Sequence, residues 1–186
     1  MSTTFSTRNR LIVAGASAAV VAAGVVGVVT VQAQNPDPAT RTPVVADAAD
    51  ANLTQSTHLS IAAATKAAQT ALDAAAEENQ RVSVAVVDRN GNVIVTLRGD
   101  GAGPQSYDAA QQKAFTAVSW NAPTTELGKR LESAPHLADI DGTLFLGGGA
   151  PVKANGAPIA GIGVAGAPSG DLDEKFAQAG VAAIGK

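Results

Sequence analysis

The sequence predicts a single α+β domain, in which an antiparallel sheet of about five strands is covered by helices, after a signal peptide and a flexible linker. Three observations carry this prediction. Helical and strand-like segments follow one another in the order α-β-β-α-α-β-β-β-α, which is typical of an α+β domain. The pairs Asn90-Gly91 and Asn155-Gly156 each separate two short apolar runs, as in a tight hairpin. The 186 residues are 46% hydrophobic, which is enough to form one core.

The first 33 residues have the pattern of a cleavable export signal. Arg8 and Arg10 precede an apolar run over residues 11–29, and Val31-Gln32-Ala33 has the small residues that a signal peptidase accepts. We expect cleavage after Ala33 and a secreted protein. The alternative is a retained membrane anchor, because the run is just long enough to span a bilayer. Its high content of Ala and Gly favours removal.

Residues 34–57 are rich in Pro, Asp, Ala and Thr and show no periodic apolar face. This composition predicts a flexible linker. The folded domain is therefore expected to span residues 58–186.

The domain is predicted to begin with a helix that Ser60 caps and that ends near Asn79. Ile61, Ala64, Ala68, Leu72 and Ala75 recur at steps of three and four residues, so they form one apolar face. Because alanine buries little area, this face stabilises a lone domain only modestly and makes self-association plausible.

Strands are expected within residues 81–99, as a hairpin around Asn90-Gly91, and over residues 143–146, 152–154 and 157–165. A second helix should follow Ser106. Its expected buried face is Tyr107, Ala110, Ala114 and Ala117.

Two further helices complete the predicted domain. A short third helix should begin at Thr124, directly after Pro123. Asp171 and Glu174 resemble a capping pair for a final helix that runs to Ile184.

Composition excludes several kinds of chemistry. The chain has no Cys, so it has no disulfide, thiolate metal site or Cys nucleophile, and its two His residues alone cannot build a three-His zinc site. The net charge of -3 and the absence of a basic stripe argue against a nucleic-acid partner. No Ser-His-acid motif is present, and we assign no catalytic residue.

Residues 161–166 match GxGxxG, the glycine pattern of dinucleotide-binding folds. That fold requires a further strand and an acidic residue about 20 residues on. The chain offers only its last helix there, so we interpret the glycines as thinning a strand for close packing.

Three side chains of the second helix could hold a flat, acidic, aromatic ligand. Lys113, Thr116 and Trp120 lie at helical spacing, so a cation, a hydroxyl and an indole share one face. The alternative, which the spacing favours, is that Trp120 packs between subunits and Lys113 is exposed to solvent. His136 is a possible haem ligand or simply an exposed loop residue.

Asp73 and Glu77 stand one helical turn apart and could share a metal ion weakly. A solvated helix face is the preferred alternative for this pair.

Residues 82–124, 141–149 and 156–174 resemble the secreted haem-binding proteins of the HbpS type, within the GlcG or haem-degrading domain family. The AVVDRNG hairpin and the ending GIGVAGAPSGDLDE carry most of this resemblance. The resemblance implies an α+β subunit, a homo-octamer, binding of haem b and iron, and a role beside a membrane sensor histidine kinase. It also implies a threonine ligand for the haem iron, which falls on Thr116, with Thr124 as another candidate. The family's acidic D-x-x-E iron pair has no counterpart, because Asp73 to Glu77 is one residue longer.

The sequence therefore predicts an exported haem-binding and iron-handling protein, accessory to a membrane redox sensor kinase. Two alternatives remain open at this point. One is a slow enzyme that modifies haem or a corrinoid, and the other is an assembly module without a ligand.

Overall fold

The structure is a computed structural model that describes residues 47–185 of the chain. The predicted signal peptide, its cleavage after Ala33 and the first part of the linker lie outside the described residues. Residues 47–59 form no regular element except a short 3₁₀ helix, Asp50–Asn52. Within the described range, every helix is too short or too polar to cross a membrane.

Within residues 47–185 the sheet has four strands in the order β2-β1-β4-β3, and every neighbouring pair is antiparallel. The strands are β1 (Ser83–Asp88), β2 (Val93–Arg98), β3 (Gly149–Ala154) and β4 (Ala157–Ala165). The prediction of about five strands is wrong by one. Residues 143–146 form no strand, because this segment binds to a helix side chain, with the Leu144 amide donating to Thr116 Oγ1 at 2.8 Å.

The two predicted hairpins are present, but they turn in different ways. At Asn155-Gly156 both residues have positive φ, 50° and 80°, as in a two-residue type I′ turn. The β1–β2 turn is longer. Its Gly91 amide donates to Asp88 O, and of the turn residues only Gly91, with φ +87°, has positive φ.

The side chain of Asp88 organises the longer turn. Its Oδ1 accepts from the amides of Asn90 and Asn92 at 2.8 and 2.9 Å. Partial burial tends to raise the pKa of this carboxyl, but the donors of Asn92 and Asn90 outweigh it and lower the pKa below its usual range.

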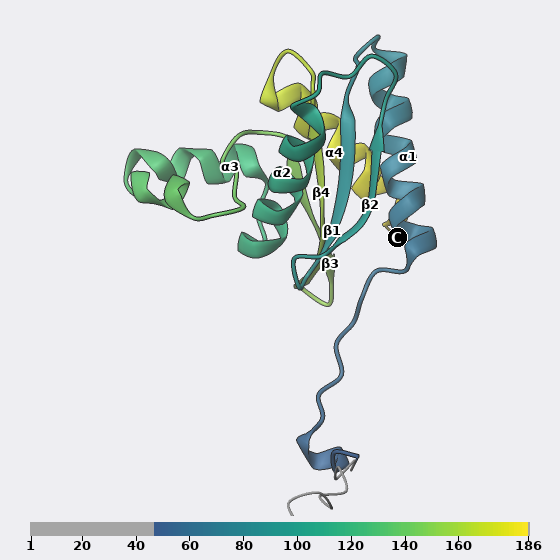
Figure 1. The fold of residues 1–186 in the computed structure, drawn as a ribbon, viewed down its shortest axis with the longest axis vertical. Helices are drawn as coiled ribbons and strands as arrows, with labels where there is room; N and C mark the ends of the chain where they lie inside the picture. The colour runs from purple at the N-terminus through teal and green to yellow at the C-terminus, as the bar shows by residue number, and fades with distance from the viewer. Residues whose placement is uncertain (1–46, 186) are drawn as a thin grey trace, which may run out of the picture. The chain divides into compact units, whose positions relative to one another are not determined.

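The helices cover the two faces of the sheet unequally (Figure 1). The helices α1 (Ile61–Glu77) and α4 (Gly170–Ile184) pack together on one face, and α2 (Ser106–Trp120) lies across β4 and β1 on the other. Ser60 caps α1 as predicted, because its Oγ accepts from the Ala63 amide. The cap of α4 differs from the prediction. Ser169 Oγ accepts from the Leu172 amide, whereas Asp171 lies inside the first turn.

The main core lies between the sheet and the pair α1 and α4. The buried face of α1 is built of alanines, and Gly180 of α4 faces Ala67 and Ala71 so closely that a Cβ there would lie 2.7 Å from Ala67 O. These small residues let the two helices approach each other. Larger side chains from the strands and from α4 fill the rest of this core: Val84, Val86, Ile162, Val164 and Phe176.

On the opposite face, α2 packs directly on the backbone of β4. A Cβ atom at Gly161 would overlap the carbonyl oxygen of Ala114, and one at Gly163 would overlap that of Ala110. The interpretation of the GxGxxG glycines as packing residues is therefore confirmed. The prediction for the buried face of α2 is partly wrong: Ala110, Ala114 and Ala117 are buried, but Tyr107 is 40% exposed.

Residues 122–141, which we call the arm, project to the side of α2 that faces away from the sheet (Figure 1). The arm contains α3 (Thr124–Gly128), which begins after Pro123 as predicted, and two 3₁₀ helices, Lys129–Glu132 and Pro135–Asp139. A small apolar cluster joins the arm to the body. Its members are Ala122, Leu127 and Phe145, with Trp120, Leu131 and Leu137 packed against them.

Candidate functional site

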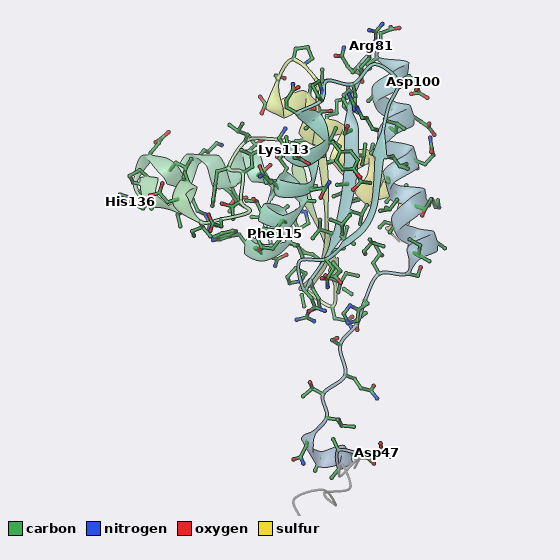
Figure 2. The ribbon with its side chains drawn as sticks, in the orientation of Figure 1. Asp47, Arg81, Asp100, Lys113, Phe115 and His136 are labelled. Carbon is green, nitrogen blue, oxygen red and sulfur yellow. The ribbon has the colours of Figure 1, made fainter. Side chains whose placement is uncertain are left out.

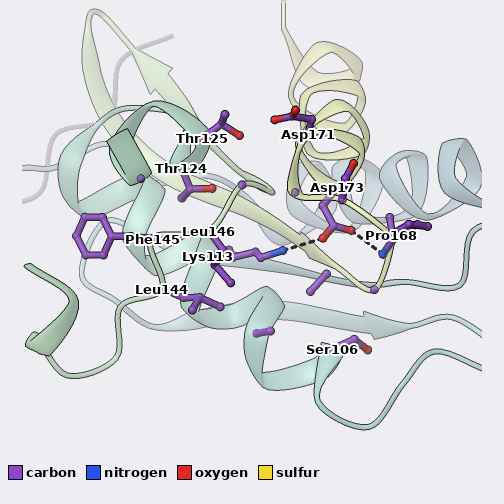
Figure 3. A pocket seen from close by; sticks show the side chains of 18 of the residues that line it. Ser106, Lys113, Thr124, Thr125, Leu144, Phe145, Leu146, Pro168, Asp171 and Asp173 are labelled. Carbon is purple, nitrogen blue, oxygen red and sulfur yellow. Dashed lines mark hydrogen bonds and ion pairs between the residues drawn. The ribbon is translucent and has the colours of Figure 1, made fainter. Parts of the chain in front are cut away.

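A pocket of about 840 Å³ lies where the arm, the first turns of α2 and the start of α4 meet (Figure 3). Its remaining walls come from the segment before β3, residues 144–147, and from the loop between β4 and α4. Most of the walls are apolar. The apolar side chains that line it are Ala109, Leu131, Leu144, Phe145, Leu146, Ala165, Ala167 and Pro168.

A buried ion pair stands in the wall of this pocket. Lys113 Nζ lies 2.7 Å from Asp173 Oδ2 and donates a second hydrogen bond to Val164 O at 3.0 Å. Lys113 is only 5% exposed and Asp173 only 3%, so the expectation of a solvent-exposed Lys113 is wrong. Lys113 can be buried because the Asp173 carboxylate balances the charge of its ammonium group in a place that solvent does not reach.

The environment of Asp173 sets its protonation. Burial raises the pKa of its carboxyl, although the Lys113 ammonium and the amide of Ala167, which donates to Oδ1 at 2.9 Å, favour the ionised form. Through these two contacts Asp173 ties α4 both to α2 and to the loop that borders the pocket.

The next residue of α4 makes a similar connection to the arm. Glu174 is 8% exposed, and its Oε2 accepts from the Thr125 amide at 2.9 Å. The predicted capping pair of Asp171 and Glu174 is therefore wrong. Glu174 instead holds α3 beside α4.

These contacts surround the glycine run 147–149, whose last residue begins β3. Gly148 has φ +126°, and a Cβ there would lie 2.8 Å from both Lys113 Nζ and Asp173 Cβ. Gly149 donates its amide to Thr124 Oγ1 at 2.7 Å. Gly147 also lines the cavity, so this glycine run helps to frame the pocket.

Thr116 does not line the pocket. Its side chain is fully buried, and its hydroxyl donates to Gln112 O at 2.8 Å and accepts from the Leu144 amide. The hydroxyl is thus engaged within the protein and has no open side toward a ligand. Thr124, the second threonine candidate, is also fully buried, but it does line the pocket.

The other predicted residues lie apart. Trp120 is half-buried and packs edge-on against Phe145, with ring centroids 5.1 Å apart, so it stands behind a pocket wall. Figure 2 places His136 at the far end of the arm, where its ring is exposed and its Nδ1 lies 3.0 Å from Asp139 Oδ2. Asp73 and Glu77 are exposed on α1, and Gln69 donates to Asp73 Oδ1. Within the described residues no group of three or more metal-ligating acids and histidines occurs.

Comparisons with known proteins agree with this architecture. Residues 59–182 match the model of the family described as "Haem degrading protein HbpS-like". The crystal structure of a double mutant of Streptomyces reticuli HbpS is 69% identical, with a TM-score of 0.74, over 78% of this chain and 98% of that chain.

Two more distant relatives extend the likeness. A structure titled as a complex of PduOC with haem is 28% identical, with a TM-score of 0.63, over 69% of this chain and 96% of that chain. An uncharacterized 15.0 kDa protein of Citrobacter freundii is 34% identical over 113 residues, which are 58% of this chain and 80% of the relative. The α+β fold, the glycine-packed β4 and the matched residues lead to one conclusion: the chain belongs to the HbpS-like family of haem-degrading proteins.

Proposed function

We propose that the protein binds haem in the pocket between the arm and the start of α4. The observation that carries the proposal is the pocket itself, whose volume of about 840 Å³ and mainly apolar walls suit a large flat ligand. Membership of the HbpS-like family and the likeness to PduOC, solved with haem, support the same ligand.

The side chains in the pocket fit haem, with an oxygen atom as the protein ligand. Among the described lining residues there is no His, Cys, Met or Tyr, which are the usual haem ligands. Two hydroxyls are present instead. Thr124 Oγ1 accepts one hydrogen bond and keeps a second lone pair, and Thr125 Oγ1 is buried with no hydrogen-bond partner among the described residues. When bound, haem would supply a redox-active iron, and Thr124 is the residue that we place beside it.

The charges indicate how a carboxylate of the ligand would be held. Lys113 is already neutralised by Asp173, so it is a poor partner for a haem propionate. Lys129 also lines the pocket and forms no salt bridge with another described residue. We therefore assign propionate pairing to Lys129, in place of Lys113.

The finer parts of the function extend this proposal. We propose that the ligand is haem b, that the chain is exported through residues 1–33, and that it assembles with copies of itself. The Ala-rich α1 supports the last point. We further propose that the protein serves a membrane sensor kinase and that Asp73 and Glu77, both exposed, offer weak contacts to iron ions.

Titration of the full chain with haemin tests the site through Trp120, the only tryptophan of the sequence. Because Trp120 packs on Phe145, a wall of the pocket, haem bound there should quench most of the tryptophan fluorescence. The quenching should saturate together with a shifted Soret band. A saturating Soret band with unchanged Trp120 emission would place the haem elsewhere, and no Soret shift on the folded protein would reject haem binding.

A further inference from the structure

The root of the arm contains an unusual number of unsatisfied polar atoms. Among the residues that the structure describes, only three buried side-chain polar atoms lack a hydrogen-bond partner, and two of them, Asn121 Oδ1 and Thr125 Oγ1, lie at this root. A Cβ built on Gly147 would lie 2.5 Å from Thr125 Oγ1, so the backbone of Gly147 covers the hydroxyl. A buried hydroxyl without a partner destabilises the arrangement that buries it.

The ends of the arm are residues that can change backbone conformation. Asn121, which precedes it, has φ +53°, and Gly142, which follows it, has φ +77°. Positive φ is rare except in Gly, Asn and Asp, and hinges are often formed by a few residues of this kind at the ends of elements. Both ends of the arm are therefore formed by residues of the kind that can serve as hinges.

The apolar cluster around Leu127 holds the arm against the body, and one buried polar contact adds a specific restraint on a rotation of the arm. Glu174 Oε2 accepts from the Thr125 amide at 2.9 Å, and this charge-assisted bond fixes the start of α3 to α4. The Gly149 amide, which donates to Thr124 Oγ1 at 2.7 Å, is a second connection that arm movement would break.

We propose that the arm is a movable wall of the pocket, that Glu174 is the positioning residue that holds it closed, and that its release controls the entry and exit of the ligand. The inference rests on the proposed haem site, whose walls include Thr124, Thr125 and Lys129 of the arm. The buried Thr125 hydroxyl favours the released arm, because it gains a hydrogen bond from water when the arm moves away from the pocket. Glu174 favours the closed arm, because its bond to the Thr125 amide exists only there.

Two variants on either side of the same contact should act in opposite directions. In full-length protein loaded with haemin, Glu174→Ala should raise the rate of haemin transfer to excess apomyoglobin about tenfold, because it removes a hydrogen bond to a charged group. Thr125→Val should lower the rate about two- to fivefold, because it removes the unsatisfied hydroxyl and keeps the shape. Glu174→Gln, whose amide oxygen still accepts, should return the rate close to that of the wild type. Glu126→Ala is the matched control, since Glu126 is an exposed acid of the arm outside the pocket.

Hydrogen exchange of the Gly149 amide tests the arm without any haem. Its own acceptor, Thr124, is unchanged in these variants, so faster exchange in Glu174→Ala and slower exchange in Thr125→Val would report movement of the arm. If the two variants change the exchange of the Gly149 amide as expected but haemin does not bind to the protein, the proposed haem site is rejected and the movement of the arm is supported. Unchanged exchange in both variants, or altered exchange with unchanged haemin transfer, would overturn the inference. Thr125→Val keeps the test decisive if Glu174→Ala does not fold.

Discussion

Replacing Lys113 by Met is expected to lower the free energy of unfolding by about 3–5 kcal/mol, because it leaves the Asp173 carboxylate buried without its cation. Urea unfolding of the variant and the wild type at neutral pH measures the loss. Lys153→Met, which removes an exposed lysine of β3, should change stability by less than about 0.5 kcal/mol. Adding Asp173→Leu to Lys113→Met should recover a large part of the loss, since no unpaired charge remains.

The same variant has a distinctive pH dependence. Burial already raises the pKa of Asp173, and without the ammonium of Lys113 its pKa should rise further. A carboxyl whose folded pKa is raised contributes stability that is fully present below its unfolded pKa, about 4, and is lost as pH rises through the folded pKa. The deficit of Lys113→Met should therefore shrink as the solution is acidified from neutral pH toward about pH 4. A deficit that stays constant over this range would contradict the account of the pair.

Replacing Gly163 by Ala is expected to lower the free energy of unfolding by about 3 kcal/mol or more, because the new methyl group overlaps the carbonyl oxygen of Ala110 in α2. The Ala110 carbonyl belongs to the backbone of α2 and cannot rotate away as a flexible side chain would. The whole of α2 must therefore move away from the sheet. Chemical denaturation measures the effect, and Gly185→Ala is the control, since its nearest contacts would lie at 3.6 Å. Equal stability of Gly163→Ala and the wild type would contradict the direct packing of α2 on β4.

The sequence predicted most elements of the fold because their signals are local. Ser60 and the alanine spacing were sufficient for α1, and the Asn-Gly pairs were sufficient for both hairpins. The prediction of a strand over residues 143–146 is wrong. Its β-like composition is real, but its backbone is bound by Thr116, a helix residue distant in the sequence.

The candidate site was predicted less well, because its contacts join distant segments. Helical spacing grouped Lys113 with Thr116 and Trp120, but it could not show that Asp173, 60 residues further on, is the partner of Lys113. The tie between Glu174 and Thr125, 49 residues apart, left no local signal either. Thr124 was named only as an alternative, and only the arrangement of the arm brings it to the pocket.

The central claim, that haem occupies this pocket, is tested most directly by haemin titration of full-length Ala109→Phe beside the wild type, read by the Soret band. Ala109 lines the pocket from α2, so a phenyl ring there fills space that the ligand needs. Ala62→Phe, on the exposed side of α1, controls for the added aromatic surface. The account predicts that Ala109→Phe weakens haemin binding about tenfold or more, since overfilling a packed site costs about 1–3 kcal/mol, while Ala62→Phe binds as the wild type does. Equal affinity of Ala109→Phe and the wild type would contradict the claim.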